Sequence, residues 1–271
     1  MEQLGSAPIG IFDSGIGGLT VAHAIKSILP NEQLIYFGDT AHLPYGDKST
    51  AAIQAYSIKI ADLLIQHGCK VIVIACNSAS AAAYDLLQEY AASRAKIINV
   101  IDPMVDAVVN SDNPGKIGVI GTRRTIATSI YKHKLTEKRK ELSVSELATP
   151  LLVPMIEEGF VDDRISHDVI GQYLSNMSLK EISTLVLGCT HYPLIKKEIN
   201  DYYDNSVEVL DSSVVTANHL KRYLEQNNLI NTDSSQSSDH FYVSDFTDSF
   251  EASAKYFFGE PVRLELHRLW E

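Results

Sequence analysis

The chain has 271 residues, of which 45% are hydrophobic, 21% charged and 8% aromatic, and its formal net charge is −11. This composition excludes an intrinsically disordered chain, and the acidic balance argues against a nucleic-acid-binding surface, which needs clustered Lys and Arg. No apolar run approaches the roughly 20 residues that span a bilayer, and residues 1–5 lack the pattern of a signal peptide. Three widely spread cysteines do not form a secreted disulfide framework. We therefore expect a cytoplasmic α/β protein without membrane or nucleic-acid partners.

Short apolar runs that end at Gly, Pro, Asn or Asp alternate with longer stretches of helical periodicity. The predicted strands are Ile9–Phe12, Gln33–Phe37, Val71–Ala75, Ile97–Ile101, Ile117–Ile120, Leu151–Met155, Leu185–Gly188 and Val207–Leu210. The predicted helices are Leu19–Leu29, Thr50–His67, Ser78–Ala92 and Arg164–Asn176. Strands rich in Ile and Val on both faces, each followed by a helix, predict parallel sheets covered by helices on two sides.

The sequence also repeats itself once. Three segments of the first half match three of the second half in the same order and at nearly the same offset: Ile9–Ser14 with Ile117–Thr122, Val73–Asn77 with Val186–Thr190, and Ile98–Asp102 with Val207–Asp211. We therefore expect two related α/β domains with pseudo-two-fold symmetry. The predicted first domain contains residues 1–101 and 211–271, and the second contains residues 102–210. The chain is expected to return to the first domain through a helix, a polar linker at 231–239 and a final segment, 241–270.

Two cysteines occupy equivalent places in this repeat, because Cys76 and Cys189 each end a predicted strand and precede a helix-capable stretch. Ligands bind beyond the carboxyl ends of parallel strands, and a helix N-terminus lowers the pKa of a nearby thiol. Asn77 or Ser78 is the predicted cap of the first helix, and Thr190 marks the start of the second. Two facing domains would place the thiols on opposite sides of one cleft, where one removes a proton as the other supplies one. This arrangement predicts inversion at a carbon atom.

Other polar residues follow the same strand ends. They are Asp13 and Ser14 after the first strand, Asp39, Tyr45 and Gly46 after the second, Thr122 and Thr125 after the counterpart of the first, and His191 beyond Cys189. The Asp13 carboxylate can assist one thiol and the His191 imidazole the other, with Glu157 a weaker candidate. Hydroxyls and N–H groups at helix starts suit the carboxylates of an anionic substrate.

Five segments of the chain resemble the cofactor-independent glutamate racemases. The matching segments are PIGIFDSGIGGL at 8–19, GDTAHLPYG at 38–46, ACNSA at 75–79, GTRRT at 121–125 and LGCTHYPL at 187–194. The resemblance implies an isomerase that supplies D-glutamate for peptidoglycan and needs neither pyridoxal phosphate nor metal. It implies that Cys76 and Cys189 are the proton donors and acceptors, Cys76 acting on D-glutamate and Cys189 on L-glutamate. It also implies substrate contacts from Asp13, Ser14, Tyr45, Gly46, Asn77, Ser78, Thr190 and His191. Ser78 departs from the usual Thr but keeps the hydroxyl. A homodimer is expected.

The same cysteines and glycines allow other interpretations. Cys69 has no counterpart in the repeat and is expected in the core. A zinc site from Cys76, Cys189 and His191 lacks the usual close spacing, and a disulfide between the two cysteines does not suit a reducing compartment. Gly15, Gly17 and Gly18 fail the dinucleotide pattern at Thr20. The roles of Glu157 and His42 stay open. An aspartate racemase, in which Thr-Glu usually follows the second cysteine, and a binding module without catalysis are the two rival functions.

Overall fold

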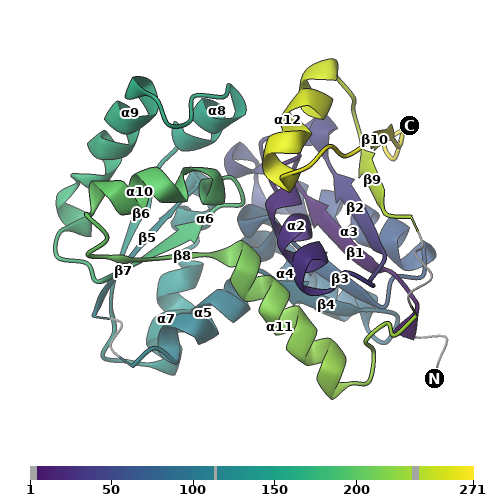
Figure 1. Ribbon diagram of the computed structural model, residues 1–271. Coiled ribbons are helices and arrows are strands. Elements are labelled where there is room, and N and C mark those ends of the chain that lie inside the picture. The colour runs from purple at the N-terminus through teal and green to yellow at the C-terminus, as the bar shows by residue number, and fades with distance from the viewer. Residues whose placement is uncertain (1–4, 113–114, 234–237) are drawn as a thin grey trace. The chain divides into compact units, whose positions relative to one another are not determined.

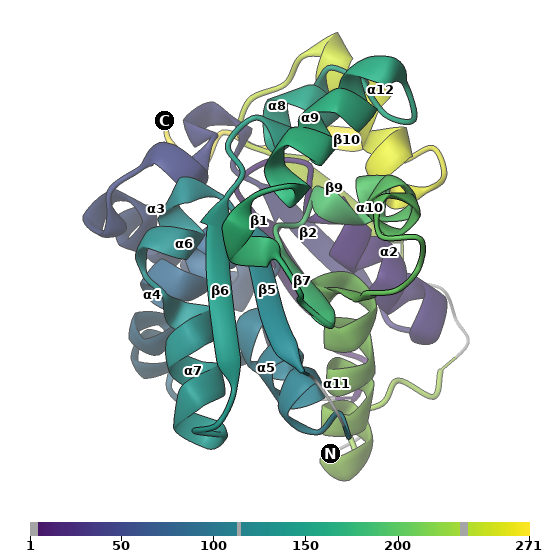
Figure 2. The same ribbon diagram turned by 90° about the vertical axis from the view of Figure 1, so that its left-hand side faces the viewer.

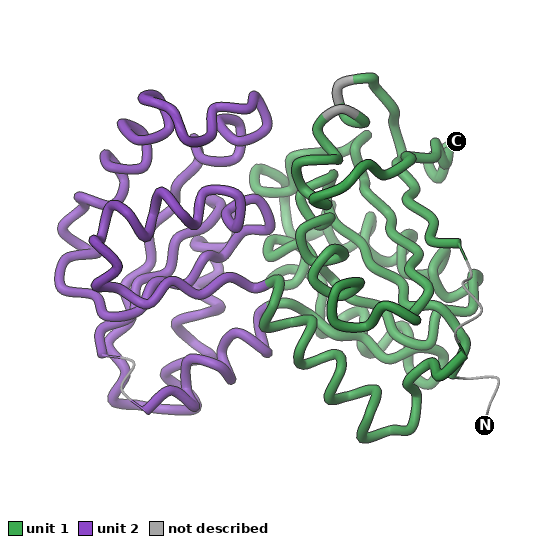
Figure 3. The backbone as a smooth tube through the Cα atoms, in the orientation of Figure 1, with its two compact units in different colours: residues 1–100, 213–271 green, residues 101–212 purple. Residues whose placement is uncertain are grey.

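The computed structural model describes residues 5–112, 115–233 and 238–271. These residues form two compact units, residues 1–100 with 213–271 (unit 1) and residues 101–212 (unit 2), coloured separately in Figure 3. Two segments named in the sequence analysis fall partly outside the described residues. They are the chain start, of which residues 1–4 are not described, and the predicted linker 231–239, of which residues 234–237 are not described. None of the described helices combines the length and the apolar character that a membrane-spanning segment needs.

Unit 1 is built on a six-stranded parallel sheet in the order β10-β9-β2-β1-β3-β4 (Figure 1). The strands are β1 Ile9–Asp13, β2 Leu34–Gly38, β3 Val71–Ile74, β4 Lys96–Asn99, β9 His240–Val243 and β10 Leu264–Leu266. The helices are α2 Leu19–Ile28, α3 Thr50–Gln66, α4 Asn77–Ala91, α11 Ser212–Gln226 and α12 Asp248–Phe258, with 3-10 turns η1 Thr40–His42 and η2 Tyr45–Asp47. All residues of β1, β2 and β3 are buried, because α3 and α4 pack together on one face and α2 and α12 on the other.

Unit 2 has a four-stranded parallel sheet in the order β6-β5-β7-β8, and Figure 2 shows β6, β5 and β7 side by side. Its strands are β5 Lys116–Gly121, β6 Ser143–Ala148, β7 Thr184–Gly188 and β8 Glu208–Asp211. Its helices are α5 Ile101–Val109, α6 Arg123–Ala127, α7 Ile130–Lys138, α8 Leu152–Glu157, α9 Arg164–Leu174 and α10 Lys196–Tyr202, with 3-10 turns η3 Met177–Leu179 and η4 Tyr192–Ile195. The four strands follow the same order as β2-β1-β3-β4 of unit 1, so the matching sequence segments occupy matching places in the two sheets. The predicted fold class, α/β with two parallel sheets, is confirmed.

One predicted strand is wrong. Residues 151–155 do not form a strand but belong mostly to α8, and the second strand of unit 2 is instead β6, Ser143–Ala148. β6 was missed because it lies at the edge of its sheet and is only partly buried, so it lacks a continuous apolar run. Pro154 does not prevent the helix, since the first N–H groups of a helix have no intrahelical acceptor. The strand predicted at 97–101 also ends earlier, at Asn99, because Ile101 begins α5.

A buried ion pair lies among the loops of unit 1. Lys70 Nζ is 2.6 Å from Glu32 Oε2, and both side chains are almost completely buried. Lys70 also donates to the carbonyls of Gly5 and Leu229, and the backbone N–H of Asn231 donates to the second Glu32 oxygen. A buried charge is tolerated only when it is paired and hydrogen-bonded. The pair therefore fastens the segment after α11 to the sheet.

Candidate active site

In unit 1, Cys76 follows β3 and is itself the N-cap residue of α4. Its backbone is extended, and its sulfur accepts a hydrogen bond from the Ala79 N–H, with N and Sγ 3.4 Å apart. The prediction that Asn77 or Ser78 caps this helix is wrong, because both already have helical positions. The thiol thus lies at the positive end of a helix, which favours negative charge on sulfur.

Two predicted site residues accompany Cys76 at the end of β1. Ser14 Oγ lies 3.8 Å from Cys76 Sγ, and the fully buried Asp13 carboxylate accepts a hydrogen bond from the Gly15 N–H at 3.0 Å. Burial raises the pKa of Tyr36, and the negative charges of Asp13 and Cys76 raise it further, so the three groups are electrostatic neighbours. Carboxylate, hydroxyl and thiol therefore form one cluster.

A glycine makes the close packing of this cluster possible. A Cβ atom at Gly18 would lie 2.5 Å from Asp13 Cβ and 3.0 Å from Ala75 Cβ. Both distances are to atoms that cannot rotate away, so no larger residue fits without a shift of the backbone. Gly18 therefore belongs to the site as a packing requirement and not as part of a dinucleotide-binding pattern.

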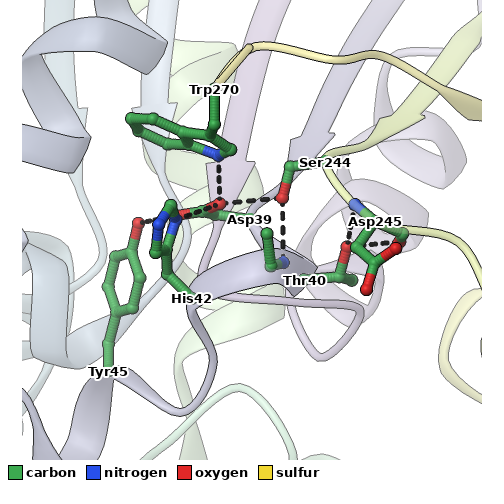
Figure 4. Close-up of polar contacts among 8 residues, drawn as sticks. Asp39, Thr40, His42, Tyr45, Ser244, Asp245 and Trp270 are labelled. Carbon is green, nitrogen blue, oxygen red and sulfur yellow. Dashed lines mark hydrogen bonds and ion pairs between the residues drawn. The ribbon is translucent and has the colours of Figure 1, made fainter.

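Tyr45 and Gly46 lie in the turn η2 after β2. Tyr45 is 1% exposed, and its hydroxyl donates to Asp39 Oδ2 at 2.6 Å. Burial raises the pKa of this phenol, and the Asp39 carboxylate raises it further, so Tyr45 stays protonated and donates. His42 Nδ1 lies 3.0 Å from the same oxygen, and Ser244 and Trp270 also contact Asp39 (Figure 4). The sequence placed Asp39 at a strand end but did not identify these partners.

In unit 2, Cys189 follows β7 and starts a chain of acid–base groups. Cys189 Sγ is 3.8 Å from His191 Nδ1, and His191 Nε2 is 2.9 Å from Glu157 Oε1. Burial lowers the pKa of His191, but the hydrogen bonds and negative charges of Cys189 and Glu157 outweigh burial and raise the pKa to about 10. His191 is therefore an imidazolium at neutral pH. Glu157, whose role the sequence left open, is its partner.

Hydroxyl groups lie near this second thiol and at the end of β5. Thr122 caps α6 by accepting from the Thr125 N–H at 3.3 Å, and the two hydroxyls are 3.2 Å apart. The Thr190 hydroxyl is 3.5 Å from His191 Nδ1. The buried Tyr192 hydroxyl lies 2.7 Å from Thr149 Oγ1 and braces the loop after Cys189. Tyr192 and Thr149 were missed, because nothing in the local pattern distinguishes them from core residues.

Cys69, the third cysteine, precedes β3, whereas Cys76 follows it. Cys69 lies in the core of unit 1, and burial raises its pKa to about 12, so it is not a nucleophile at neutral pH. No disulfide joins the cysteines of the described chain. Within the described ranges, no group of three His, Cys, Asp or Glu side chains is arranged to hold a metal ion.

Comparisons with known proteins identify the family of the chain. Residues 18–220 match the family model for Asp/Glu/hydantoin racemase. A glutamate racemase of Chlorobaculum parvum is 41% identical over 256 residues, which cover 94% of each chain, and one of Neisseria meningitidis is 39% identical over 97% of each. The crystal structure of Francisella tularensis glutamate racemase in complex with D-glutamate has a TM-score of 0.91 and 41% identity, covering 98% of this chain and 99% of that one.

The fold and these matches define the class of protein: it is a racemase, an enzyme of the isomerase class. The chain belongs to the Asp/Glu/hydantoin racemase family. The resemblance seen in the sequence is thereby confirmed.

Proposed function

We propose that this racemase interconverts L-glutamate and D-glutamate, with Cys76 and Cys189 acting on opposite faces of Cα. The observation that carries the proposal is that each thiol follows a buried sheet strand and has a polar side chain beside it: Ser14 Oγ lies 3.8 Å from Cys76 Sγ, and His191 Nδ1 lies 3.8 Å from Cys189 Sγ. The relatives that share about two fifths of their residues with this chain are glutamate racemases, which favours glutamate over aspartate.

The chemistry is a transfer of two protons. One thiolate removes the α-proton, so that the C–H bond breaks and an S–H bond forms, and the opposing thiol gives its proton to the other face of the carbanion. As the family resemblance implies, Cys189 acts on L-glutamate and Cys76 on D-glutamate. The substrate ammonium stabilises the carbanion, and no cofactor is required. After one turnover the two sulfurs have exchanged protonation states.

The neighbours of the thiols support these steps. The His191 imidazolium, held by Glu157 at 2.9 Å, can donate toward Cys189 and favour its thiolate. Asp13, buried in the cluster of Cys76, assists the other thiol. The carboxylates of the substrate are bound by hydroxyl, amide and backbone groups at the strand ends: Ser14, Tyr45, Gly46, Asn77, Ser78, Thr122, Thr125, Thr190 and His191. We further propose that the product serves peptidoglycan synthesis in the cytoplasm and that the enzyme is a homodimer.

Solvent isotope incorporation tests the two-thiol mechanism. In deuterated water, D-glutamate formed from L-glutamate is expected to carry deuterium at Cα while the remaining substrate stays largely protiated, because each sulfur serves one face. Equal labelling of both pools would indicate a single base. Circular dichroism of the purified protein, with a chelator and with glutamate or aspartate, separates glutamate racemase from aspartate racemase and from a binding module without turnover.

Substitution of each thiol provides the second test. Cys76→Ser and Cys189→Ser are each expected to lower kcat by about 10³-fold, since a hydroxyl is a much weaker acid and base at neutral pH. Cys69→Ala is the matched control, because this third thiol is in the core and should change kcat little. Full activity in either serine variant would remove that cysteine from the mechanism.

A further inference from the structure

The Asp39 side chain is the centre of a hydrogen-bond network in unit 1. It is fully buried, and a buried carboxylate is stable only when its oxygens accept hydrogen bonds. Oδ2 accepts from the Tyr45 hydroxyl at 2.6 Å and lies 3.0 Å from His42 Nδ1, and these residues belong to the two 3-10 turns that follow β2, η2 and η1. This half of the network is local in sequence.

The other half comes from the last part of the chain. Asp39 Oδ1 accepts from Ser244 Oγ and from Trp270 Nε1, both at 2.8 Å, as Figure 4 shows. Ser244 follows β9, which pairs with β2, and its hydroxyl also accepts from the Ala41 N–H at 2.9 Å. One carboxylate therefore joins the turn after β2 to two residues more than 200 positions away.

Aromatic contacts hold the Trp270 ring in place. The His42 ring stacks on Tyr56 with centroids 4.1 Å apart, and the indole meets the His42 ring edge-on at 4.5 Å and the Tyr56 ring at 5.4 Å. Edge-to-face and offset-stacked arrangements are the favourable ones for aromatic pairs. The indole N–H is thus aimed at Asp39 by packing and not by one flexible contact.

We propose that Ser244 and Trp270 are positioning residues for substrate binding: they fix the Asp39 carboxylate, which in turn holds Tyr45 and the Tyr45–Gly46 turn in place. The inference rests on the proposed function, in which this turn contacts glutamate. Neither residue takes part in proton transfer. Because the turn binds substrate in the ground state and the transition state alike, its displacement raises KM more than it lowers kcat.

Racemisation kinetics of three variants test the proposal. Trp270→Phe removes the N–H and keeps an aromatic ring, and Ser244→Ala removes the hydroxyl, whereas Ser244→Thr keeps it. Loss of one charge-assisted hydrogen bond, partly compensated by the remaining donors, is expected to raise KM for D-glutamate about three- to tenfold with less than a twofold change in kcat. Ser244→Thr, which keeps the hydroxyl group, should have a KM close to that of the wild type. Tyr256→Phe, an exposed aromatic residue of the same unit, is the control.

The chain offers a second, independent signal, since Trp270 is its only tryptophan. In the unaltered protein, D-glutamate should change the indole emission saturably, over the concentration range that saturates turnover. Unchanged KM in folded variants, or loss of kcat in proportion to unfolded protein, would overturn the proposal. If none of the variants folds, an indole emission of the unaltered protein that does not change with D-glutamate would overturn the proposal. Wild-type protein without turnover would instead contradict the proposed function.

Discussion

The contact between Glu157 and His191 permits a quantitative prediction. Glu157→Gln keeps the size of the side chain and removes its charge, 2.9 Å from His191 Nε2. Because the carboxylate stabilises the imidazolium, we expect the pKa of His191 to fall from about 10 toward its ordinary value. The positive charge beside Cys189 would then be lost at a lower pH than in the wild type, so conversion of L-glutamate would decline earlier on the alkaline side.

The exposure of the Glu157 side chain determines how far its removal lowers the pKa of His191. A hydrogen bond to a charged group contributes about 1.5–3 kcal/mol. The Glu157 side chain is 37% exposed, so solvent screening reduces this to about 1 kcal/mol. That energy corresponds to a decrease of roughly 0.7 in the pKa of His191, so the ring stays protonated at neutral pH. We therefore expect the decline of kcat/KM for L-glutamate at alkaline pH to begin roughly 0.7 pH units lower in Glu157→Gln, with little change near pH 7.

The same contact makes stability depend on pH. Because folding raises the pKa of His191, its contribution to the free energy of unfolding is complete below about pH 6.5 and is lost as pH rises through about 10. Glu157→Gln should therefore lower the melting temperature at pH 6, and the difference from wild type should disappear by about pH 10.5.

Histidine NMR titration and pH-dependent kinetics measure these effects. The His191 resonance among the nine histidines is assigned by its loss in His191→Asn. Glu158→Gln is the matched control, because it removes the same charge from the adjacent, exposed position. An unchanged His191 pKa in Glu157→Gln, or an equal decrease in Glu158→Gln, would refute the reasoning.

Two further predictions concern stability and are measured by chemical denaturation. Gly18→Ala should lower the free energy of unfolding by about 1–3 kcal/mol, because the new Cβ would lie 2.5 Å from Asp13 Cβ. Gly171→Ala in α9, where nothing lies nearer than 3.8 Å to the new Cβ, should raise it by about 0.5–1 kcal/mol. Equal effects of the two substitutions would contradict the tight packing at Gly18. Lys70→Met should lower the free energy of unfolding by about 3–5 kcal/mol, because it leaves a buried carboxylate without its cation. Lys197→Met, at an exposed pair, is the control and should change stability little. A small effect of Lys70→Met on the free energy of unfolding would mean that water reaches the Lys70–Glu32 pair.

The sequence alone determined the fold class and the positions of both thiols. Continuous apolar runs are encoded locally, because a strand buried on both faces needs an apolar residue at every position. Cys76 and Cys189 could be placed at strand ends for that reason. The partly buried edge strand β6 has no such run, so its prediction failed.

The tertiary structure decided which side chains meet. Glu157 reaches His191 because α8 and the loop after β7 lie together in unit 2, and Trp270 reaches Asp39 because the last strands of the chain pair beside β2. Such contacts depend on the order of strands in the sheet and on the course of each loop, which local periodicity does not record. The positions of the two thiols thus follow from short sequence segments, whereas the side chains that contact their surroundings are brought there by packing between distant segments.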